Sequence, residues 1–508
     1  MEFGKLTSED QTIPVPPGHQ KLIITRLVDK TDHHDNLVFE QEYLLAPNED
    51  KIEATAAVFA VEGVLSGEGM IFLKHAALPE SRQIKGAADL VVEKKKIRFN
   101  SGGYPYVVLK YAGGAEGRIR ALQEYQMSLR PYVAGRDGLL LTNTWGDRSG
   151  DKKLNEEFIL AEIDAAAKLG ADVVEIDEGW QQGKTADLGG QNEGYWSQHD
   201  FWKPNNKRFP NGLKPLMDAC TKNRMQMGLW FSPDSLADFA NWESDVDVLL
   251  HMHQHDGINF FKLDGVKIRS RAGEINFDKL VQTVVAKSGG KITIDLDTTA
   301  QIRPGYFGEM NIGPVFVENR YSDWHNYWPH HTLRNLWKLA HTIHPARLRM
   351  EFLNNFRNEK LYEGDPLGPG KYDPAYLFAT VMFSSPLGWF ENSMLRGKFV
   401  NAVAPVVKVW KEHRDAIFSQ AIIPIGETPC GKAWSGFVAG DPKGVGYVLI
   451  FRELNDRKEF DFSTGFFPAG EYSVERLAGA GEVSVSGAGI KARVDQPLSF
   501  CFARVTRK

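Results

Sequence analysis

From Gly138 onward, the sequence alternates short apolar runs with longer stretches of helical spacing. Residues 155–169 have apolar side chains three and four apart, and Gly170 then ends this predicted helix before the apolar run 171–177. Eight such runs, mostly alternating with helices over about 275 residues, are typical of a (β/α)8 barrel. The eight predicted strands are 139–145, 171–177, 225–231, 258–264, 291–297, 313–318, 347–353 and 387–390.

The flanking sequence has a different pattern, in which short alternating segments are separated by Gly, Pro, Asn and Asp. Residues 1–115 predict an N-terminal β-sandwich-like domain, and residues 419–508 predict a C-terminal antiparallel β domain. A helical connector is expected over 116–137, before the barrel at 138–418. We therefore predict an α/β fold, a (β/α)8 TIM barrel flanked by two β domains.

Composition argues against several classes of protein. The formal net charge is −5, and no basic run marks a surface for nucleic acid or acidic lipid. No apolar stretch is long enough to cross a membrane. The three cysteines are far apart and no glycine-rich phosphate loop occurs, so we expect no metal and no cofactor. The first residues lack an apolar signal core, which predicts a cytoplasmic protein or, after removal of a signal peptide, a periplasmic or secreted one.

Carboxylates, basic side chains and tryptophans gather where the predicted barrel strands end. Lys262 and Asp264 are two residues apart, so they share one face of the fourth strand. Barrel enzymes keep their active sites at these carboxyl ends. Sugar rings stack on tryptophan, sugar hydroxyls bond to charged side chains, and glycosidic cleavage uses two carboxyl groups. The candidates are Trp145, Asp177, Glu178, Trp180, Trp230, Lys262, Asp264, Asp297, Arg303, Arg320 and Asp323.

The order of these motifs along the chain resembles the retaining α-galactosidases of the glycoside hydrolase 36/27 clan. That clan also has a β-sandwich before the barrel and a smaller β domain after it. The segments that carry the resemblance are Asn143-Thr144-Trp145, residues 168–180 ending in Asp177-Glu178-Gly179-Trp180, Phe209-Pro210-Asn211-Gly212-Leu213, Met227-Gly228-Leu229-Trp230-Phe231, Lys262-Leu263-Asp264-Gly265 and Ser322-Asp323.

The resemblance implies an exo-acting hydrolase that removes a terminal α-galactosyl residue through a covalent glycosyl-enzyme. Asp264 would be the nucleophile and Asp323 the acid/base, and we expect Asp323 to be buried and to hold its proton at rest. The partner would be an oligosaccharide or glycoside, and relatives are often homo-oligomers. The other implied substrate contacts are Trp145, Asp177, Glu178, Trp180, Trp230, Lys262, Asp297, Arg303 and Arg320.

The sequence departs from the clan's pattern at three places. Glu178 stands where the clan usually has Asp, and Ser232-Pro233-Asp234 replaces Glu-Pro-Glu. Residues 295–303 replace the Cys-Ser-Gly-Gly-Gly-Arg loop that meets the sugar's 2-position. These changes leave open an α-glycosidase for another sugar (α-N-acetylgalactosamine, β-L-arabinopyranose or an α-glucoside), a raffinose-synthase-like transglycosylase and an inactive carbohydrate-binding protein. Glu318 and Asp297 also compete with Asp323 as rim carboxylates.

Overall fold

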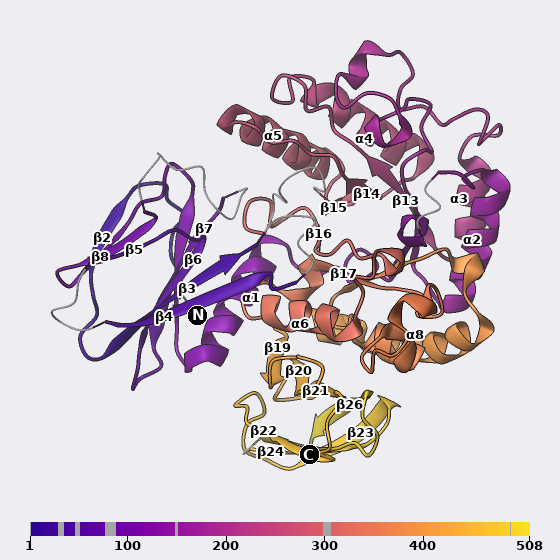
Figure 1. The fold of residues 1–508 in the computed structure, drawn as a ribbon. Coiled ribbons are helices and arrows are strands. Elements are labelled where there is room, and N and C mark those ends of the chain that lie inside the picture. The colour runs from indigo at the N-terminus through magenta and orange to yellow at the C-terminus, as the bar shows by residue number, and fades with distance from the viewer. Residues whose placement is uncertain are drawn as a thin grey trace.

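The computed structural model describes residues 2–28, 35–45, 51–76, 88–147, 151–297, 306–487 and 489–508. Its centre is a closed barrel of eight strands in chain order, each parallel to its neighbours (Figure 1). The predicted (β/α)8 fold class is therefore confirmed. The barrel strands are β11 (Leu141–Asn143), β12 (Val173–Ile176), β13 (Gln226–Phe231), β14 (Phe260–Leu263), β15 (Thr293–Leu296), β16 (Val315–Phe316), β17 (Leu348–Phe352) and β18 (Ser385–Trp389).

The first barrel helix begins and ends close to the positions that the sequence predicts. Asn155 caps this helix, its side chain accepting from the backbone N–H of Phe158, and Gly170 ends it with a φ of 90°. The barrel helices are α2 (Glu156–Leu169), α3 (Lys214–Lys222), α4 (Trp242–Asp256), α5 (Arg271–Lys287), α6 (Pro329–Leu339), α7 (Pro374–Ala379) and α8 (Gly397–Phe418). The 3-10 turns are η1 (Thr144–Asp147), η2 (Ala186–Leu188), η3 (Tyr195–Ser197), η4 (Ser322–Trp324), η5 (Pro345–Arg347), η6 (Glu359–Tyr362), η7 (Pro369–Lys371) and η8 (Asn392–Met394).

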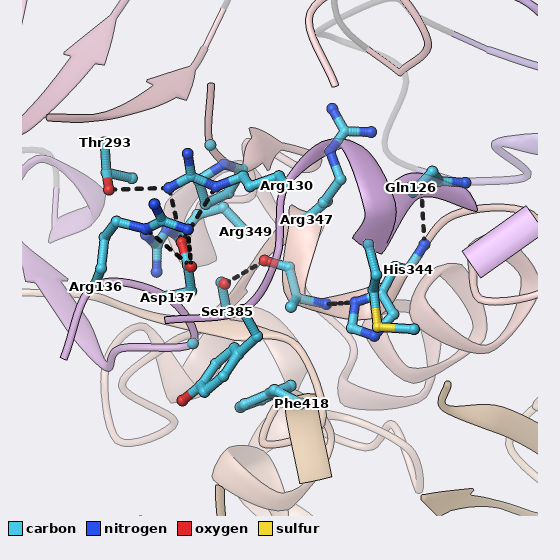
Figure 2. Close-up of a pocket in the computed structure, with 16 residues that line it drawn as sticks. Gln126, Arg130, Arg136, Asp137, Thr293, His344, Arg347, Arg349, Ser385 and Phe418 are labelled. Atoms are coloured by element: carbon cyan, nitrogen blue, oxygen red, sulfur yellow. Dashed lines mark hydrogen bonds and ion pairs between the residues drawn. The ribbon is translucent and has the colours of Figure 1, made fainter. Parts of the chain in front are cut away.

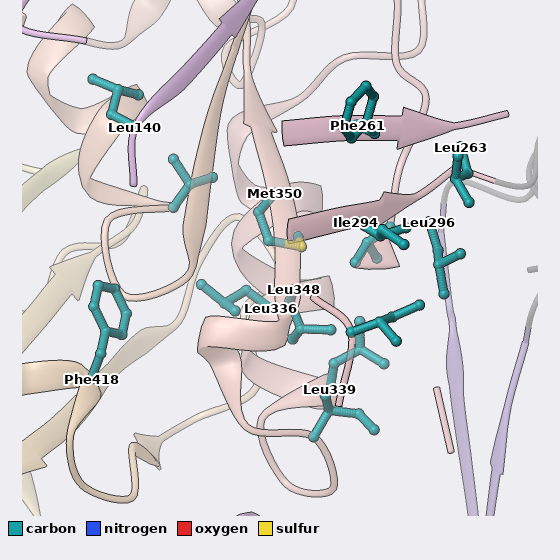
Figure 3. Packing of buried hydrophobic residues seen from close by; sticks show 14 of the residues in the cluster. Leu140, Phe261, Leu263, Ile294, Leu296, Leu336, Leu339, Leu348, Met350 and Phe418 are labelled. Carbon is teal, nitrogen blue, oxygen red and sulfur yellow. The ribbon is translucent and has the colours of Figure 1, made fainter. Parts of the chain in front are cut away.

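Side-chain alternation along β14 separates the two layers of the barrel. Phe261 and Leu263 point outward and join the apolar layer between the strands and the helices (Figure 3). Phe260 points inward and packs in a second cluster with Phe316 and Trp389. Lys262 is also internal, because its Nζ lies 5.1 Å from the Trp389 ring centroid. By the same alternation, the side chain of Asp264, which directly follows β14, points to the inner side of the barrel at the carboxyl end of the strand.

The N-terminal domain is a sandwich of a six-stranded and a four-stranded sheet, with an apolar cluster that includes Phe59, Phe72 and Phe99. Helix α1 (Gly114–Leu129) connects this domain to the barrel. Figure 1 shows the N-terminal domain and the barrel side by side. The strands are β1 (Glu2–Phe3), β2 (Gln11–Pro14), β3 (Gln20–Leu27), β4 (Val38–Leu45), β5 (Ile52–Ala54), β6 (Val58–Gly63), β7 (Gly69–Lys74), β8 (Leu90–Glu93), β9 (Lys96–Phe99) and β10 (Tyr106–Tyr111).

The C-terminal domain has a five-stranded and a three-stranded antiparallel sheet and packs on the barrel near α6 and α8 (Figure 1). The Trp337 indole N–H donates to the backbone oxygen of Ile425 at 3.0 Å, and Gln123 donates to that of Ile422 at 2.8 Å. Within the described residues, no helix has the length and apolarity needed to span a membrane. The strands are β19 (Ile423–Gly426), β20 (Trp434–Gly440), β21 (Val445–Arg452), β22 (Glu459–Phe462), β23 (Tyr472–Gly479), β24 (Glu482–Ser486), β25 (Gly489–Arg493) and β26 (Ser499–Arg507).

An arginine-rich cavity of about 30 Å³ lies at the amino-terminal end of the barrel strands (Figure 2). Arg130 donates to Asp137 at 2.7 Å, and Arg349 donates to Asp295 at 2.7 Å. The Arg347 guanidinium donates to the backbone oxygen of Tyr306 at 2.9 Å. The space suits one or two water molecules, and these guanidinium groups already have partners in the protein. The arginine cluster therefore closes this end of the barrel and has a structural role.

Candidate active site

A polar cavity of about 520 Å³ opens at the opposite end, where the strands finish. Its volume is in the range of small-molecule sites. Seven residues that the sequence predicts for the site line it, namely Trp145, Asp177, Glu178, Trp230, Lys262, Asp264 and Asp297. The other lining residues are Thr185, Ala186, Asp187, Asn192, Tyr195, Ser232, Gly265, Lys267, Asn319, Tyr321 and Trp324.

The Asp264 carboxylate is fixed by donors from two strand ends. The Trp230 indole N–H donates to Oδ2 at 3.0 Å, and the backbone N–H of Gly265 donates to Oδ1 at 2.6 Å. Gly265 has a φ of 68°, a conformation that glycine adopts without strain. The side chain of Asp264 keeps 16% of its surface exposed, so it is oriented and still accessible from the cavity.

Lys262 is the buried cation at the centre of this site. Its Nζ lies 2.9 Å from Asp177 Oδ2, 3.1 Å from Asp297 Oδ2 and 3.9 Å from Asp264 Oδ2. Burial acts to lower the pKa of Lys262, but the charges of these three carboxylates raise it well above its usual value. Lys262 is therefore charged at neutral pH and offsets the repulsion between acidic groups that come from three strands.

Asn143 and Glu175 support Asp177 from beneath. The Asn143 amide donates to Asp177 Oδ2 and to Glu175 Oε1, each at 2.7 Å. Glu175 is 3% exposed, and burial, followed by the charge of Asp295, raises its pKa to about 8. Glu175 is therefore a neutral carboxylic acid at pH 7, which avoids adding one more negative charge under the site.

The pKa of Glu175 predicts a component of stability that depends on pH. The folded protein keeps this proton up to about pH 8, whereas the unfolded chain releases it near the ordinary value of 4.5. Between these values the unfolded state binds fewer protons, so the free energy of unfolding falls as pH rises, by up to about 1.4 kcal/mol per pH unit. In urea unfolding, the free energy of unfolding of Glu175→Gln should fall less with rising pH than that of the wild type. Equal slopes for the two proteins would contradict a protonated Glu175.

Glu178 lines the cavity while being only 2% exposed. Burial, followed by the charges of Asp187, Asp177 and Asp264, raises its pKa to about 9. At neutral pH it is therefore a carboxylic acid that can donate as well as accept. Within the described part of the chain, Glu178 Oε1 has no hydrogen-bond partner, so it is available to a bound molecule.

The loop that follows β12 supplies cavity residues that the sequence did not predict. Asp187 lies in η2 and is exposed at the rim, where partial desolvation of its carboxyl, followed by the charges of Asp264 and Asp177, raises its pKa. Asn192 lies nearby and its backbone oxygen accepts from Lys267 Nζ at 3.0 Å. These residues lie ten or more positions beyond the strand end, in a segment without periodicity. No pattern in the sequence marks where their side chains point.

Contacts with the segment after β13 and with helix α4 hold this loop in place. The backbone N–H of Gly194 donates to Asp234 at 2.7 Å, and the Trp196 indole N–H donates to Asp245 at 3.0 Å. Asp234 is the residue that replaces the second Glu of the clan's Glu-Pro-Glu motif, and it is fully buried. Its carboxylate therefore anchors the loop instead of lining the cavity.

Among the described residues, three do not lie where the sequence predicts them. Trp180 is fully buried behind the cavity, where its indole N–H donates to the backbone oxygen of Trp230 at 2.7 Å, so it supports Trp230 and does not face a substrate. Arg320 is also fully buried, because its guanidinium is bonded to Glu318 and Asp35 at 2.8 Å each. Asp323 in η4 is exposed, against the expected burial, although its neighbours Tyr321 and Trp324 line the cavity. Arg303 lies outside the described residues.

The two carboxylates that compete with Asp323 have other partners. Glu318 has no exposed surface and accepts from Arg320, Thr332 and Asn335, so it is not a rim residue. Asp297 lines the cavity and is paired with Lys262. Neither has the accessibility of Asp323.

Sequence comparison identifies relatives for part of the chain. A model of the Melibiase family matches residues 104–258. The α-galactosidase Mel36A of Lactobacillus acidophilus is 31% identical over 114 residues, which are 22% of this chain and 14% of that protein. The α-galactosidase AgaA of Geobacillus stearothermophilus is 31% identical over 136 residues, 26% of this chain and 17% of that protein. The matched stretch spans less than a fifth of either relative.

Structural comparison extends over nearly the whole chain. A GH36 α-galactosidase AgaA variant of Geobacillus stearothermophilus, solved in complex with raffinose, has a TM-score of 0.70 at 14% identity, with 98% of this chain and 76% of that chain covered. The galactosidase domain of the α-galactosidase–sucrose kinase AgaSK has a TM-score of 0.71 at 12% identity, covering 98% and 75%. A Melibiase-family model thus matches residues 104–258, and the chain has the fold of the GH36 α-galactosidases.

Proposed function

We propose that this protein is a retaining exo-acting glycoside hydrolase that removes a terminal α-galactosyl or closely related residue from an oligosaccharide or glycoside. The observation that carries the proposal is the Asp264 carboxylate, held by Trp230 and Gly265 at the end of β14 inside a polar cavity of about 520 Å³. The raffinose complex of the AgaA variant supports an oligosaccharide as the substrate class.

In the first step one carboxylate oxygen of Asp264 attacks the anomeric carbon of the bound sugar. The bond from that carbon to the leaving oxygen breaks, and the proton of Asp323 passes to the leaving oxygen. The product is a glycosyl ester on Asp264 with inverted configuration. Lys262, 3.9 Å from Asp264, places a positive charge beside the attacking carboxylate.

In the second step Asp323 takes a proton from water, and the water oxygen attacks the anomeric carbon. The ester bond to Asp264 breaks and restores the original configuration. Glu178 and Asp177 hold the outer hydroxyls, with Glu178 as a donor because its proton is retained. A sugar hydroxyl in place of water would give transglycosylation by the same step.

The test is hydrolysis of a panel of nitrophenyl glycosides, with the anomer first released followed by proton NMR. We expect activity on the α-galactoside or β-L-arabinopyranoside and initial release of the retained anomer. Initial release of the inverted anomer would refute double displacement, and binding without hydrolysis of any sugar would favour a carbohydrate-binding protein.

A second specificity follows from Glu178, one methylene longer than the aspartate usual in the clan. β-L-Arabinopyranose has the ring configuration of α-galactose without the hydroxymethyl group. The longer acid fills space beside the outer hydroxyls, where that group would lie, and this favours the smaller sugar.

Glu178→Asp should move selectivity toward the α-galactoside. Shortening the side chain restores room for the hydroxymethyl group, and a methylene-sized change in a pocket alters discrimination about tenfold or more. The measurement is the ratio of kcat/KM for the two nitrophenyl glycosides in each protein, which cancels changes in active-enzyme concentration. An unchanged ratio would refute this role of Glu178.

A further inference from the structure

An aspartate of the N-terminal domain contacts the barrel beside the loop that carries Asp323. Asp35 precedes β4, and its Oδ1 lies 2.8 Å from the Arg320 guanidinium and 2.9 Å from His331 Nδ1. The side chain of Arg320 is fully buried, whereas that of Asp35 keeps 45% of its surface exposed. The contact joins residues 285 positions apart in the sequence.

Arg320 fixes both ends of the segment 320–326, which contains η4 and Asp323. Its guanidinium donates to the backbone oxygen of Asn326 at 2.7 Å, and its own backbone N–H donates to Glu351 at 2.5 Å. The side chain of Asn326 in turn accepts from the backbone N–H of Tyr321 at 2.8 Å. The position of this guanidinium therefore sets the path of the backbone on both sides of Asp323.

Two acidic side chains hold that guanidinium, Glu318 from the barrel and Asp35 from the sandwich. Burial acts to raise the pKa of Asp35, but His331 and Arg320 hold it well below its usual range, so the pair is ionised. The Nη2 group donates to both acids at 2.8 Å. Removing the Asp35 charge takes away the acidic contact that the N-terminal domain makes with this guanidinium and leaves the bond to Glu318.

We propose that Asp35 is a positioning residue through which the N-terminal domain sets the geometry of Asp323 for proton transfer to the leaving group. The inference rests on the proposed function of Asp323. Asp35 does not line the cavity, so it acts on the reaction through Arg320. A proton donor misplaced by a fraction of an ångström loses efficiency, while the nucleophile Asp264, on a different strand, keeps its contacts.

The test uses the dependence on the leaving group, which a general loss of structure does not produce. Protonation by the acid is needed for an alkyl or sugar leaving group and is nearly dispensable for an acidic dinitrophenol. For Asp35→Asn we expect kcat/KM to fall about tenfold with a methyl glycoside and less than about twofold with the dinitrophenyl glycoside of the same sugar. Asp35→Glu, which keeps the charge, should recover most of the loss.

Glu40→Gln is the matched control. Glu40 lies on β4, has a similarly exposed carboxylate (48%) and pairs with Arg118, away from the barrel loop. It should leave both substrates unaffected. Thermal unfolding of each variant shows whether the fold is kept, and if Asp35→Asn does not fold, the ratio of the two substrates is measured on Asp35→Ser.

Asp323→Asn separates failure of this inference from failure of the proposed function. It should show the same leaving-group selectivity as Asp35→Asn with a larger loss, about a hundredfold or more for the methyl glycoside. If Asp323→Asn is selective and the Asp35 variants slow both substrates equally, or neither, Asp35 has no positioning role and the function stands. If Asp323→Asn is itself unselective, the acid/base assignment and the role of Asp35 both fall.

Discussion

Asp264→Ala is expected to lower kcat by about four orders of magnitude or more, with the fold retained. Removal of a catalytic nucleophile causes losses of this size because the covalent route disappears. The fold should remain because the side-chain contacts that the described residues show for Asp264 are the bonds from Trp230 and Gly265 and a 3.9 Å approach to Lys262. Lys262 stays paired with Asp177 and Asp297, so no buried charge is left alone.

Azide distinguishes a lost nucleophile from a damaged site. In Asp264→Ala a small anion can enter the vacated space and attack the anomeric carbon from the same side, which gives the glycosyl azide of inverted configuration. The experiment requires a substrate with an activated leaving group, because that group must depart although no ester with residue 264 can form. Asp218→Asn, which removes an exposed carboxylate on α3, is the control and should retain full activity. Near-normal turnover by Asp264→Ala, or no rescue by azide, would contradict the assignment.

The centre of this site could be predicted from sequence because strand geometry determines it. A buried strand has a period of two, so Lys262 and Asp264 share the inner face, and parallel strands end at one rim with Asp177 and Trp230. These residues lie within a few positions of a strand end, where the backbone leaves little freedom. The helix α2 was predictable for a similar reason, since Asn155 and Gly170 are local capping signals.

The rest of the site depends on contacts between distant parts of the chain. Arg320 has the spacing of a rim residue, but Asp35, from another domain, and Glu318 fix its guanidinium within the protein. Asp187 and Asn192 reach the cavity only because Asp234 and Asp245 anchor the loop around them. β16 has two residues where six were predicted, and Pro314 has no N–H with which to extend the start of the strand.

Lys262→Met should cost both stability and activity. Methionine fills a similar volume between the Phe316 and Trp389 rings but leaves Asp177, Asp297 and Asp264 without the cation that they surround. Breaking a buried ion pair by removing one partner costs about 3–5 kcal/mol, because the remaining charge is uncompensated. The measurement is the free energy of unfolding in urea at neutral pH, together with kcat/KM for the best nitrophenyl glycoside.

Lys267→Met is the matched control for that cost. Lys267 lines the same cavity, but it lies half-buried at the rim and bonds only to the backbone oxygen of Asn192 among the contacts of its Nζ that the described residues show. Its loss should change the free energy of unfolding by about 0.5 kcal/mol or less. If the two variants unfold alike, Lys262 does not stabilise the protein by compensating the charges of these carboxylates.

The pH dependence of Lys262→Met carries the argument further. Without the cation, the carboxylates around it repel one another, and uptake of a proton by the cluster relieves that repulsion at the cost of the negative charge that the reaction needs. Raising the pH removes that proton, so the relative activity of the variant should increase toward alkaline pH while its stability falls. A merely misfolded variant would lose both together as pH rises. Opposite trends of activity and stability would therefore show that Lys262 serves the reaction by balancing the negative charge of the carboxylate cluster.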